Sequence, residues 1–187
     1  MAVGKIRQAL QANGQAANTI IVYTSDNGYF LGERGLADKW YMYEESIRVP
    51  LIVYDPRLPQ GKQGQQRPEM ALNIDLAPTL LEWAAVPKPA AMQGQSLLPL
   101  IQGSGAPWRN EWYYSHLFSH PQIPKSEGVR TEEWSYCRFL ETSPAFEFLY
   151  NLAKDPMQTT NLIGSPAHAA DASRLRNSCQ QWRQKLS

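Results

Sequence analysis

The feature that most restricts the fold is a pair of short apolar runs, each rich in β-branched residues. They read NTIIVYT at 18–24 and VPLIVY at 49–54. Runs without polar alternation are typical of strands covered on both faces, as in the parallel sheets of α/β proteins. A helical pattern over 3–15 precedes the first run, and LAPTLLEWAA at 76–85 predicts another helix. We therefore expect an α/β architecture with a mostly parallel sheet and flanking helices.

This predicted sheet is incomplete. Asp75 can cap the second helix, which tolerates Pro78 in its first turn and stops before Pro87. Only about two strands accompany these helices, and isolated parallel strands need neighbours along their edges and helices on both faces. Residues 1–105 are therefore predicted to be the latter half of a larger sheet domain rather than an independent fold.

The pattern changes after residue 105. Short aromatic runs that partly alternate with polar residues predict antiparallel strands. They lie at 111–118, 127–141 and 145–152. A final helical pattern over 167–186 carries Leu175, Cys179 and Trp182 on one face. Residues 106–187 are therefore predicted to be a small antiparallel-sheet subdomain packed by a C-terminal helix.

Charge and composition exclude some classes of partner. The net charge of +1 comes from 18 basic and 17 acidic residues, which gives no electrostatic reason to expect nucleic acid or an anionic membrane. No stretch approaches the roughly 20 apolar residues of a membrane span, and the first residues lack the apolar core of a secretory signal. Cys137 and Cys179 have no metal-ligand spacing, so we expect buried thiols rather than a disulfide or a nucleophile.

The first candidate for chemistry is the pair Asp26 and Asn27, which follows the first apolar run directly. Open α/β sheets bind ligands at the carboxyl ends of their strands. Carboxylate and amide oxygens suit Ca²⁺ or Mg²⁺ better than zinc, but Ca²⁺ takes about 6–8 oxygens, so two ligands are only part of a shell. Asp-Asn-Gly alone is also an ordinary turn signal. The tripeptide by itself leaves both interpretations open.

The second candidate is Lys39, in a following loop rich in glycine and aromatic residues. A compact ammonium there can meet an anionic oxygen, although a lone loop lysine is usually solvated. Glu44, Glu45 and Arg48 fall at helical spacings, so local ion pairing explains them without a functional role.

The whole segment over 25–57, SDNGYFLGERGLADKWYMYEESIRVPLIVYDPR, resembles the second metal-binding segment of the sulfatases in the alkaline-phosphatase-like superfamily. That segment reads Ser-Asp-(Asn or His)-Gly, then Gly-Glu-His-Gly, a lysine, and Tyr-Glu-Glu-Ser-x-Arg-x-Pro. Further matches are NIDLAPTLLEWA at 73–84, LYNLAKDP at 149–156 and TTNL at 159–162. The chain looks like the back half of such an enzyme, similar to N-sulfoglucosamine sulfohydrolase-type and mucin-desulfating bacterial sulfatases.

The resemblance implies a role for each matching residue. Asp26 and Asn27 match two ligands of one calcium ion, whose shell the N-terminal half of the same enzyme would complete. Lys39 matches the lysine that binds the sulfate and stabilises its growing charge. The family's nucleophile is a formylglycine made from cysteine in Cys-x-Pro-x-Arg. Neither Cys137 nor Cys179 stands in that motif, so we expect this chain alone not to hydrolyse sulfate esters.

Other expectations concern the substrate, which the resemblance makes a sulfated small molecule or glycan. Arg34 replaces the histidine of Gly-Glu-His-Gly. It either contacts the substrate anion, or is a surface arginine or one that contacts site residues rather than the substrate. His116 and His120, in the sequence YYSHLFSHPQIP, are further candidates for substrate contact, with structural or solvent-exposed roles as the alternative. The family location would be periplasmic or secreted.

Two other functions are consistent with the same residues. A phosphodiesterase or phosphonate hydrolase of this superfamily shares the metal and lysine, and would differ in its nucleophile motif and in its preference for aryl phosphate over aryl sulfate. A truncated, non-catalytic remnant that only binds a partner or a glycan is the alternative outside enzymology.

Overall fold

The computed structural model describes residues 2–186, which form two compact units. The first contains residues up to 26 together with 49–108, and the second contains 27–48 together with the residues from 109 onward. The boundary between residues 105 and 106 stays a prediction about sulfatase domains, but segment 27–48 groups with the C-terminal part of the chain. Within the described residues, no helix has the length and apolar character that crossing a membrane requires.

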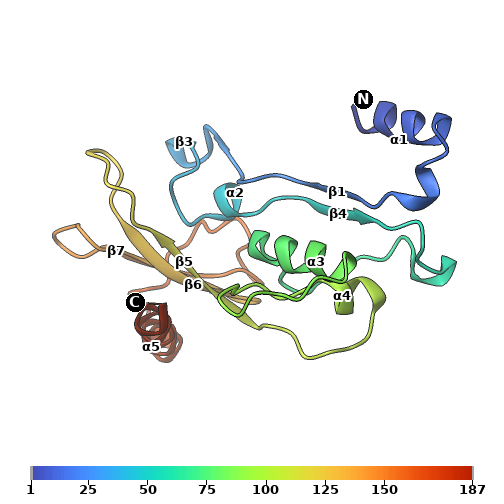
Figure 1. Ribbon diagram of the computed structural model, residues 1–187. Helices are drawn as coiled ribbons and strands as arrows, with labels where there is room; N and C mark the ends of the chain where they lie inside the picture. Colours follow the sequence, from blue (N-terminus) through green and yellow to red (C-terminus); the bar gives the residue numbers. More distant parts are fainter. Residues whose placement is uncertain (1, 187) are drawn as a thin grey trace. The chain divides into compact units, whose positions relative to one another are not determined.

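The first unit contains two strands and several helices (Figure 1). Its helices and strands are α1 (Ala2–Ala12), β1 (Ile21–Thr24), β4 (Leu51–Tyr54), α3 (Leu76–Trp83) and α4 (Leu98–Gln102). Short 3-10 turns lie at Ala16–Asn18, Gln60–Lys62 and Asn73–Asp75. The predicted α/β class and the helices at both predicted positions are confirmed.

The predicted strand direction is wrong for this unit. β1 and β4 pair antiparallel, with Ile21 opposite Tyr54 and Thr24 opposite Leu51. Directly opposed residues of an antiparallel pair share a face, so Tyr23 and Ile52 lie together on one face. The apolar runs correctly predicted strands with two apolar faces, but apolar content carries no information about the direction in which two strands pair.

α3 covers one face of the β1–β4 pair, where Val22 and Val53 line a small apolar cavity together with Leu76, Leu80 and Trp83. The opposite face carries Tyr23 and Ile52, which are 49% and 60% exposed. Two apolar faces predict two covering layers, and α3 supplies one of them.

Asp75 is fully buried before α3 but does not cap that helix with its side chain. Its carboxylate accepts the N–H of Leu72 at 2.8 Å and that of Gln95 at 2.9 Å. Thr79 extends this network, because its hydroxyl donates to the Asp75 carbonyl and accepts the N–H of Leu97. Asp75 therefore does not have the predicted capping role. Its hydrogen bonds connect the start of α3 to the segment that leads to α4.

The second unit is built on a four-stranded antiparallel sheet in the order β5-β6-β7-β8. Its main elements are β5 (Glu111–His116), β6 (Ser126–Thr131), β7 (Trp134–Phe139), β8 (Glu147–Asn151) and α5 (Ala169–Leu186). Segment 27–48 adds β2 (Phe30–Leu31), β3 (Ala37–Asp38) and α2 (Glu44–Ile47), with 3-10 turns at Glu33–Gly35 and, before α5, at Pro166–His168. The predicted antiparallel sheet and final helix are confirmed.

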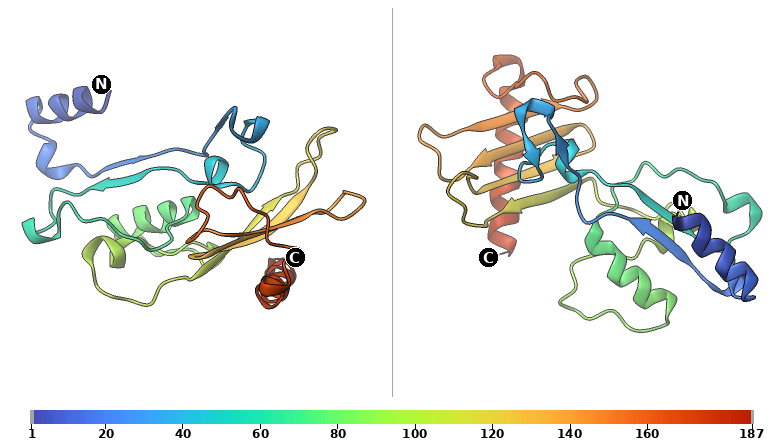
Figure 2. Two further views of the ribbon diagram at one scale, coloured as in Figure 1. Left: turned by 180° about the vertical axis from the view of Figure 1, so that it is seen from behind. Right: turned by 90° about the horizontal axis from the view of Figure 1, so that it is seen from above.

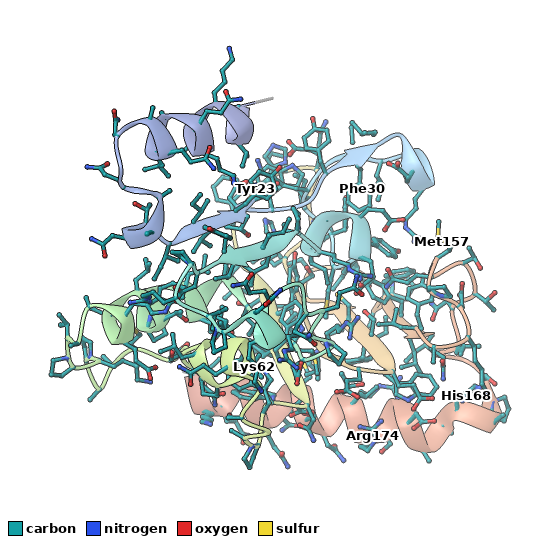
Figure 3. All side chains as sticks on the ribbon, turned by 90° about the vertical axis from the view of Figure 1, so that its right-hand side faces the viewer. Tyr23, Phe30, Lys62, Met157, His168 and Arg174 are labelled. Carbon is teal, nitrogen blue, oxygen red and sulfur yellow. The ribbon has the colours of Figure 1, made fainter. Side chains whose placement is uncertain are left out.

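α5 crosses one face of this sheet (Figure 2). Leu175 and Cys179 of the helix are fully buried against Val129, Tyr136 and Leu149 of the sheet. His168 immediately precedes α5, and Arg174 lies within the helix (Figure 3). The predicted apolar face of the helix is therefore the face that packs.

Segment 27–48 covers the other face of the sheet. Met42 is fully buried in a cluster with Cys137 and Phe148. The Met42 side chain lies so close to β6 that a Cβ built on Gly128 would be 2.4 Å from the Met42 sulfur. The same Cβ would be 2.2 Å from the Tyr136 carbonyl oxygen in the neighbouring strand β7. The unit therefore has three layers: α5, the sheet, and the segment that contains Asn27 and Lys39.

Candidate metal and anion site

The turn after β1 is fixed immediately beyond the predicted metal ligands. The N–H of Gly28 donates to the carbonyl of Ser46, and the N–H of Tyr29 donates to the carbonyl of Glu45, both at 2.8 Å. A Cβ on Gly28 would lie only 2.0 Å from the Glu45 carbonyl oxygen. Only glycine allows this approach, so the backbone after Asn27 is anchored to α2.

The two predicted metal ligands are consecutive residues. Asp26 is exposed and is the last residue of its part of the first unit, whereas Asn27 is half-buried and opens the second unit. The Ser25 hydroxyl lies 3.3 Å from an Asp26 carboxylate oxygen. Within residues 2–186, no three His, Cys, Asp or Glu side chains form a group that could hold a metal ion. The convergence of these oxygens with Lys39 stays a prediction.

Lys39 presents its ammonium at the surface from a fixed backbone. Its carbonyl accepts the hydroxyl of Ser46 at 2.5 Å, while its side chain is 39% exposed. Nζ lies 3.6 Å from an Asp38 carboxylate oxygen and 5.6 Å from the centre of the Trp40 ring. Exposed ion pairs of this kind are weak, so an incoming anion can compete with Asp38 for the ammonium.

Arg34 is held within the second unit. Its guanidinium donates to the Gln158 carbonyl at 2.8 Å, to the Met157 carbonyl at 2.5 Å and to the Glu45 carboxylate at 3.1 Å. It also lies 4.2 Å from the centre of the Tyr43 ring, and the Arg34 side chain is only 19% exposed. These contacts give Arg34 a packing role within the second unit and do not favour contact with a substrate anion.

Gln158 was not predicted, because one glutamine in a polar loop carries no sequence signal of its own. It is almost fully buried, and its side-chain oxygen accepts the N–H of Glu44, the first residue of α2, at 2.8 Å. The Arg130 guanidinium of β6 donates two hydrogen bonds to the Glu44 carboxylate, at 3.2 and 3.3 Å. The first turn of α2 is therefore held from β6 and from the loop that precedes α5.

His116 and His120 lie near Lys39 through a set of aromatic contacts. The His116 ring lies 5.4 Å from the Trp40 ring, and its two nitrogens are buried without a hydrogen-bond partner among the described residues. His120 is exposed and stacks 6.5 Å from Phe118, while its Nδ1 accepts the N–H of Gln122. Trp40 and Phe118, which join these groups, were not predicted, because aromatic residues in loops are by default packing residues.

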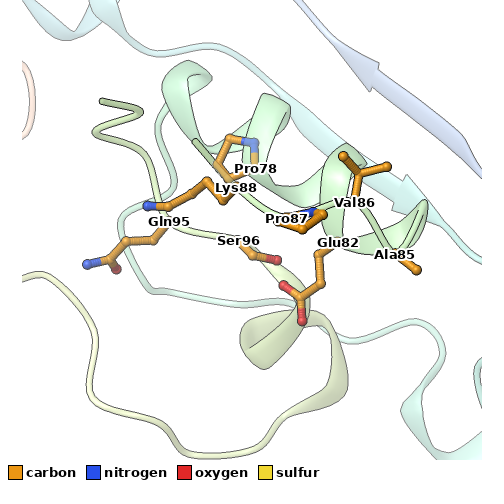
Figure 4. Close-up of a pocket in the computed structure, with 8 residues that line it drawn as sticks. All are labelled: Pro78, Glu82, Ala85, Val86, Pro87, Lys88, Gln95 and Ser96. Carbon is orange, nitrogen blue, oxygen red and sulfur yellow. The ribbon is translucent and has the colours of Figure 1, made fainter. Parts of the chain in front are cut away.

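The first unit has a separate pocket of about 630 Å³ (Figure 4). It is lined by Pro78, Glu82, Ala85, Val86, Pro87, Lys88, Gln95 and Ser96. None of these residues belongs to the predicted site. Lys88 within it is engaged, because its ammonium donates to the carbonyls of Met92 and Gly94.

Comparison with known proteins identifies the family. The family model described as N-sulphoglucosamine sulphohydrolase, C-terminal, matches residues 32–185. An N-acetylglucosamine-6-O-sulfatase of Bacteroides thetaiotaomicron is 37% identical over 173 residues, which are 89% of this chain and 30% of that protein. The human N-acetylglucosamine-6-sulfatase is 34% identical, over 86% of this chain and 34% of its own length.

Solved structures agree with the sequence comparison. A protein in complex with its substrate D-glucosamine-2-N,6-O-disulfate is 33% identical with a TM-score of 0.88, over 97% of this chain and 37% of that chain. A phosphonate monoester hydrolase of Agrobacterium radiobacter is 27% identical with a TM-score of 0.84, over 97% and 38%. This chain therefore spans about a third of its relatives, and it belongs to the family of sulfatase C-terminal regions represented by N-sulphoglucosamine sulphohydrolase.

Proposed function

We propose that this chain is the C-terminal part of a sulfuric ester hydrolase that acts on a sulfated sugar. The observation that carries the proposal is the location of Lys39, on a segment that forms one layer of the C-terminal unit. Support comes from the family match and from relatives named as sulfatases of N-acetylglucosamine.

Lys39 is the proposed sulfate-binding residue. Its ammonium is exposed, and its backbone is fixed by Ser46 of α2. Fixed positive charge at the place where negative charge grows lowers the barrier to hydrolysis, because the site need not reorganise during the reaction. Asp38 is the ion-pair partner of the ammonium and gives way when the sulfate arrives.

Asp26 and Asn27 are the proposed metal ligands in this chain. One carboxylate and one amide oxygen are hard donors, which fits Ca²⁺, although they supply only two of about 6–8 ligands. When bound, the ion neutralises charge on the sulfate oxygens. The remaining ligands and the formylglycine nucleophile are assigned to the N-terminal half of the same enzyme, so the isolated chain is expected to be inactive.

The phosphonate hydrolase alternative rests on the similarity to solved phosphonate monoester hydrolases, with TM-scores of 0.84 and 0.79. The sulfatase interpretation has the higher identity, 37% against 27%. A preference for aryl phosphonate over aryl sulfate would reverse this order. A remnant without catalysis would hydrolyse neither in any context.

A chimeric enzyme tests the proposal. This chain replaces the matching region of the N-acetylglucosamine-6-O-sulfatase of Bacteroides thetaiotaomicron, and release of sulfate from N-acetylglucosamine-6-sulfate is measured. The chimera is expected to be active, and Lys39→Ala to abolish activity. Lys154→Ala, at an exposed lysine of the same unit, is the matched control. If Lys39→Ala is as active as Lys154→Ala, the assignment of Lys39 is wrong.

Calcium binding by the chain provides an independent test of the metal assignment. Two ligands cannot fill a calcium shell, so a calorimetric titration of the 187-residue chain is expected to detect only weak binding. Tight binding of one ion per chain would contradict the assignment of the missing ligands to another part of the enzyme.

A further inference from the structure

The strongest unassigned feature is a row of aromatic rings in the second unit, here called the aromatic row. It is formed by the half-buried Trp40 and the exposed Phe118 and His120. The Trp40 and Phe118 rings lie 6.1 Å apart with 18° between their planes. Phe118 and His120 lie 6.5 Å apart with 27° between theirs. Phe118 is 59% exposed and its neighbour Leu117 is 57% exposed. Exposed rings that lie next to one another offer an apolar surface on which a ligand can pack.

Polar groups surround the aromatic row. The ammonium of Lys39 lies 5.6 Å from the Trp40 ring centre. The His116 ring lies 5.4 Å from Trp40 and 6.4 Å from Phe118. Both His116 nitrogens are buried and lack a partner among the described residues. At least one of them carries a hydrogen in every protonation state, so His116 has a donor that nothing in the described part of the chain satisfies.

The aromatic row is anchored at Trp40, where the ring meets the rest of the unit. The Trp40 carbonyl accepts the hydroxyl of Tyr114, in β5, at 3.4 Å. The preceding carbonyl, of Lys39, accepts the hydroxyl of Ser46, in α2. Two elements therefore fix the position of Trp40 beside the ammonium, which limits the ordering that a ligand would require.

We propose that the aromatic row binds the pyranose ring of the sulfated sugar. The apolar C–H face of the sugar packs against the exposed ring of Phe118 and the edge of Trp40, and the sulfate points toward Lys39. This inference rests on the proposed function, and it assigns Trp40 and Phe118 as residues that contact the sugar ring.

The chemistry around the row favours a sugar over a protein partner. The buried centres of protein interfaces are depleted of charged residues, whereas an ammonium and two imidazoles lie among these rings. Sites for small polar ligands combine aromatic walls with a few polar groups that set orientation. A pyranose sulfate offers all three complementary features: an apolar face, hydroxyl groups and one anionic substituent.

The test is a nuclear magnetic resonance titration of the 187-residue chain with three probes. They are N-acetylglucosamine-6-sulfate, N-acetylglucosamine and inorganic sulfate. Phe118→Ala is expected to weaken the binding of both sugars at least fivefold. The affinity for inorganic sulfate is expected to stay unchanged. Phe118→Leu, which keeps apolar bulk without the ring, is expected to behave in the same way. The control is Phe146→Ala, another exposed phenylalanine of this unit, at 44% exposure.

Lys39→Ala separates the two proposals. This substitution is expected to weaken the binding of inorganic sulfate and of the sulfated sugar. The affinity for N-acetylglucosamine is expected to stay unchanged. If Lys39→Ala has no effect but Phe118→Ala still weakens both sugars, the sulfate assignment fails and the aromatic row stands. If neither sugar binds, or Phe118→Ala weakens the sugars no more than Phe146→Ala does, the aromatic row is not a sugar site.

Discussion

Replacing Gly28 by alanine is predicted to loosen the turn that carries the proposed ligand Asn27. The new Cβ would lie 2.0 Å from the carbonyl oxygen of Glu45, 2.9 Å from its carbonyl carbon and 3.0 Å from that of Ser46. All three are backbone atoms of α2, so a rotamer change cannot relieve the contacts. The turn must move away, which breaks the two hydrogen bonds that Gly28 and Tyr29 donate at 2.8 Å.

The size of the effect follows from those bonds. Each backbone hydrogen bond contributes a net of about 0.5–1.5 kcal/mol, so the free energy of unfolding of the second unit is expected to fall by roughly 1–3 kcal/mol. The chimeric sulfatase is expected to lose activity as well, because Asn27 moves with the turn.

Urea unfolding followed by tryptophan fluorescence measures the loss of stability. Gly164→Ala is the matched control: it lies in the same unit, and nothing lies within 4 Å of the position that the new Cβ would take. We expect that variant to change the free energy of unfolding by no more than about 0.5 kcal/mol. Equal stability of the Gly28 and Gly164 variants would show that the turn is not anchored to α2.

Three further predictions concern the second unit. Arg34→Met is expected to lower the unfolding free energy by about 2–3 kcal/mol, because two loop carbonyls and a carboxylate lose a charged donor; no loss in a urea melt would contradict the packing role. The Arg176 guanidinium holds the pKa of Glu147 below its ordinary value of 4.5. The ion pair therefore stabilises the folded chain above pH 4.5, and this contribution is lost as the pH falls through the lowered pKa. Arg176→Met should therefore lower the free energy of unfolding at pH 7. If the difference in unfolding free energy between this variant and the unchanged chain does not shrink in acid, the pairing with Glu147 is refuted. Burial raises the pKa of Cys137, and that of Cys179 to about 12, so a disulfide reagent at pH 8 should label neither thiol until urea unfolds the chain.

Local patterns predicted most of the secondary structure and only part of its pairing. The aromatic runs predicted the strands of the antiparallel sheet because its two faces pack against α5 and against segment 27–48, and both faces need large side chains. The runs at β1 and β4 predicted strands for the same reason, yet their antiparallel pairing was missed. Strand direction depends on the path of the chain between two strands, which periodicity does not encode.

The same limit applies to the candidate site. Asp26, Asn27 and Lys39 were found because they lie within one continuous motif. Arg34 and Gln158 contact each other across 124 positions of sequence, and no local pattern reports such a pair. Trp40 and Phe118 were likewise invisible as a pair, because each alone is an ordinary loop aromatic.

Segment 27–48 explains why a motif that lies between two strands of one unit depends on another unit for its shape. Its buried residue Met42 occupies space that Gly128 leaves open on β6, and Arg130 and Gln158 fix the first turn of α2. Every one of these contacts is made by the C-terminal part of the chain. The backbone that carries Lys39 therefore takes its conformation from the C-terminal sheet, which gives that sheet a direct role in presenting the proposed sulfate-binding ammonium.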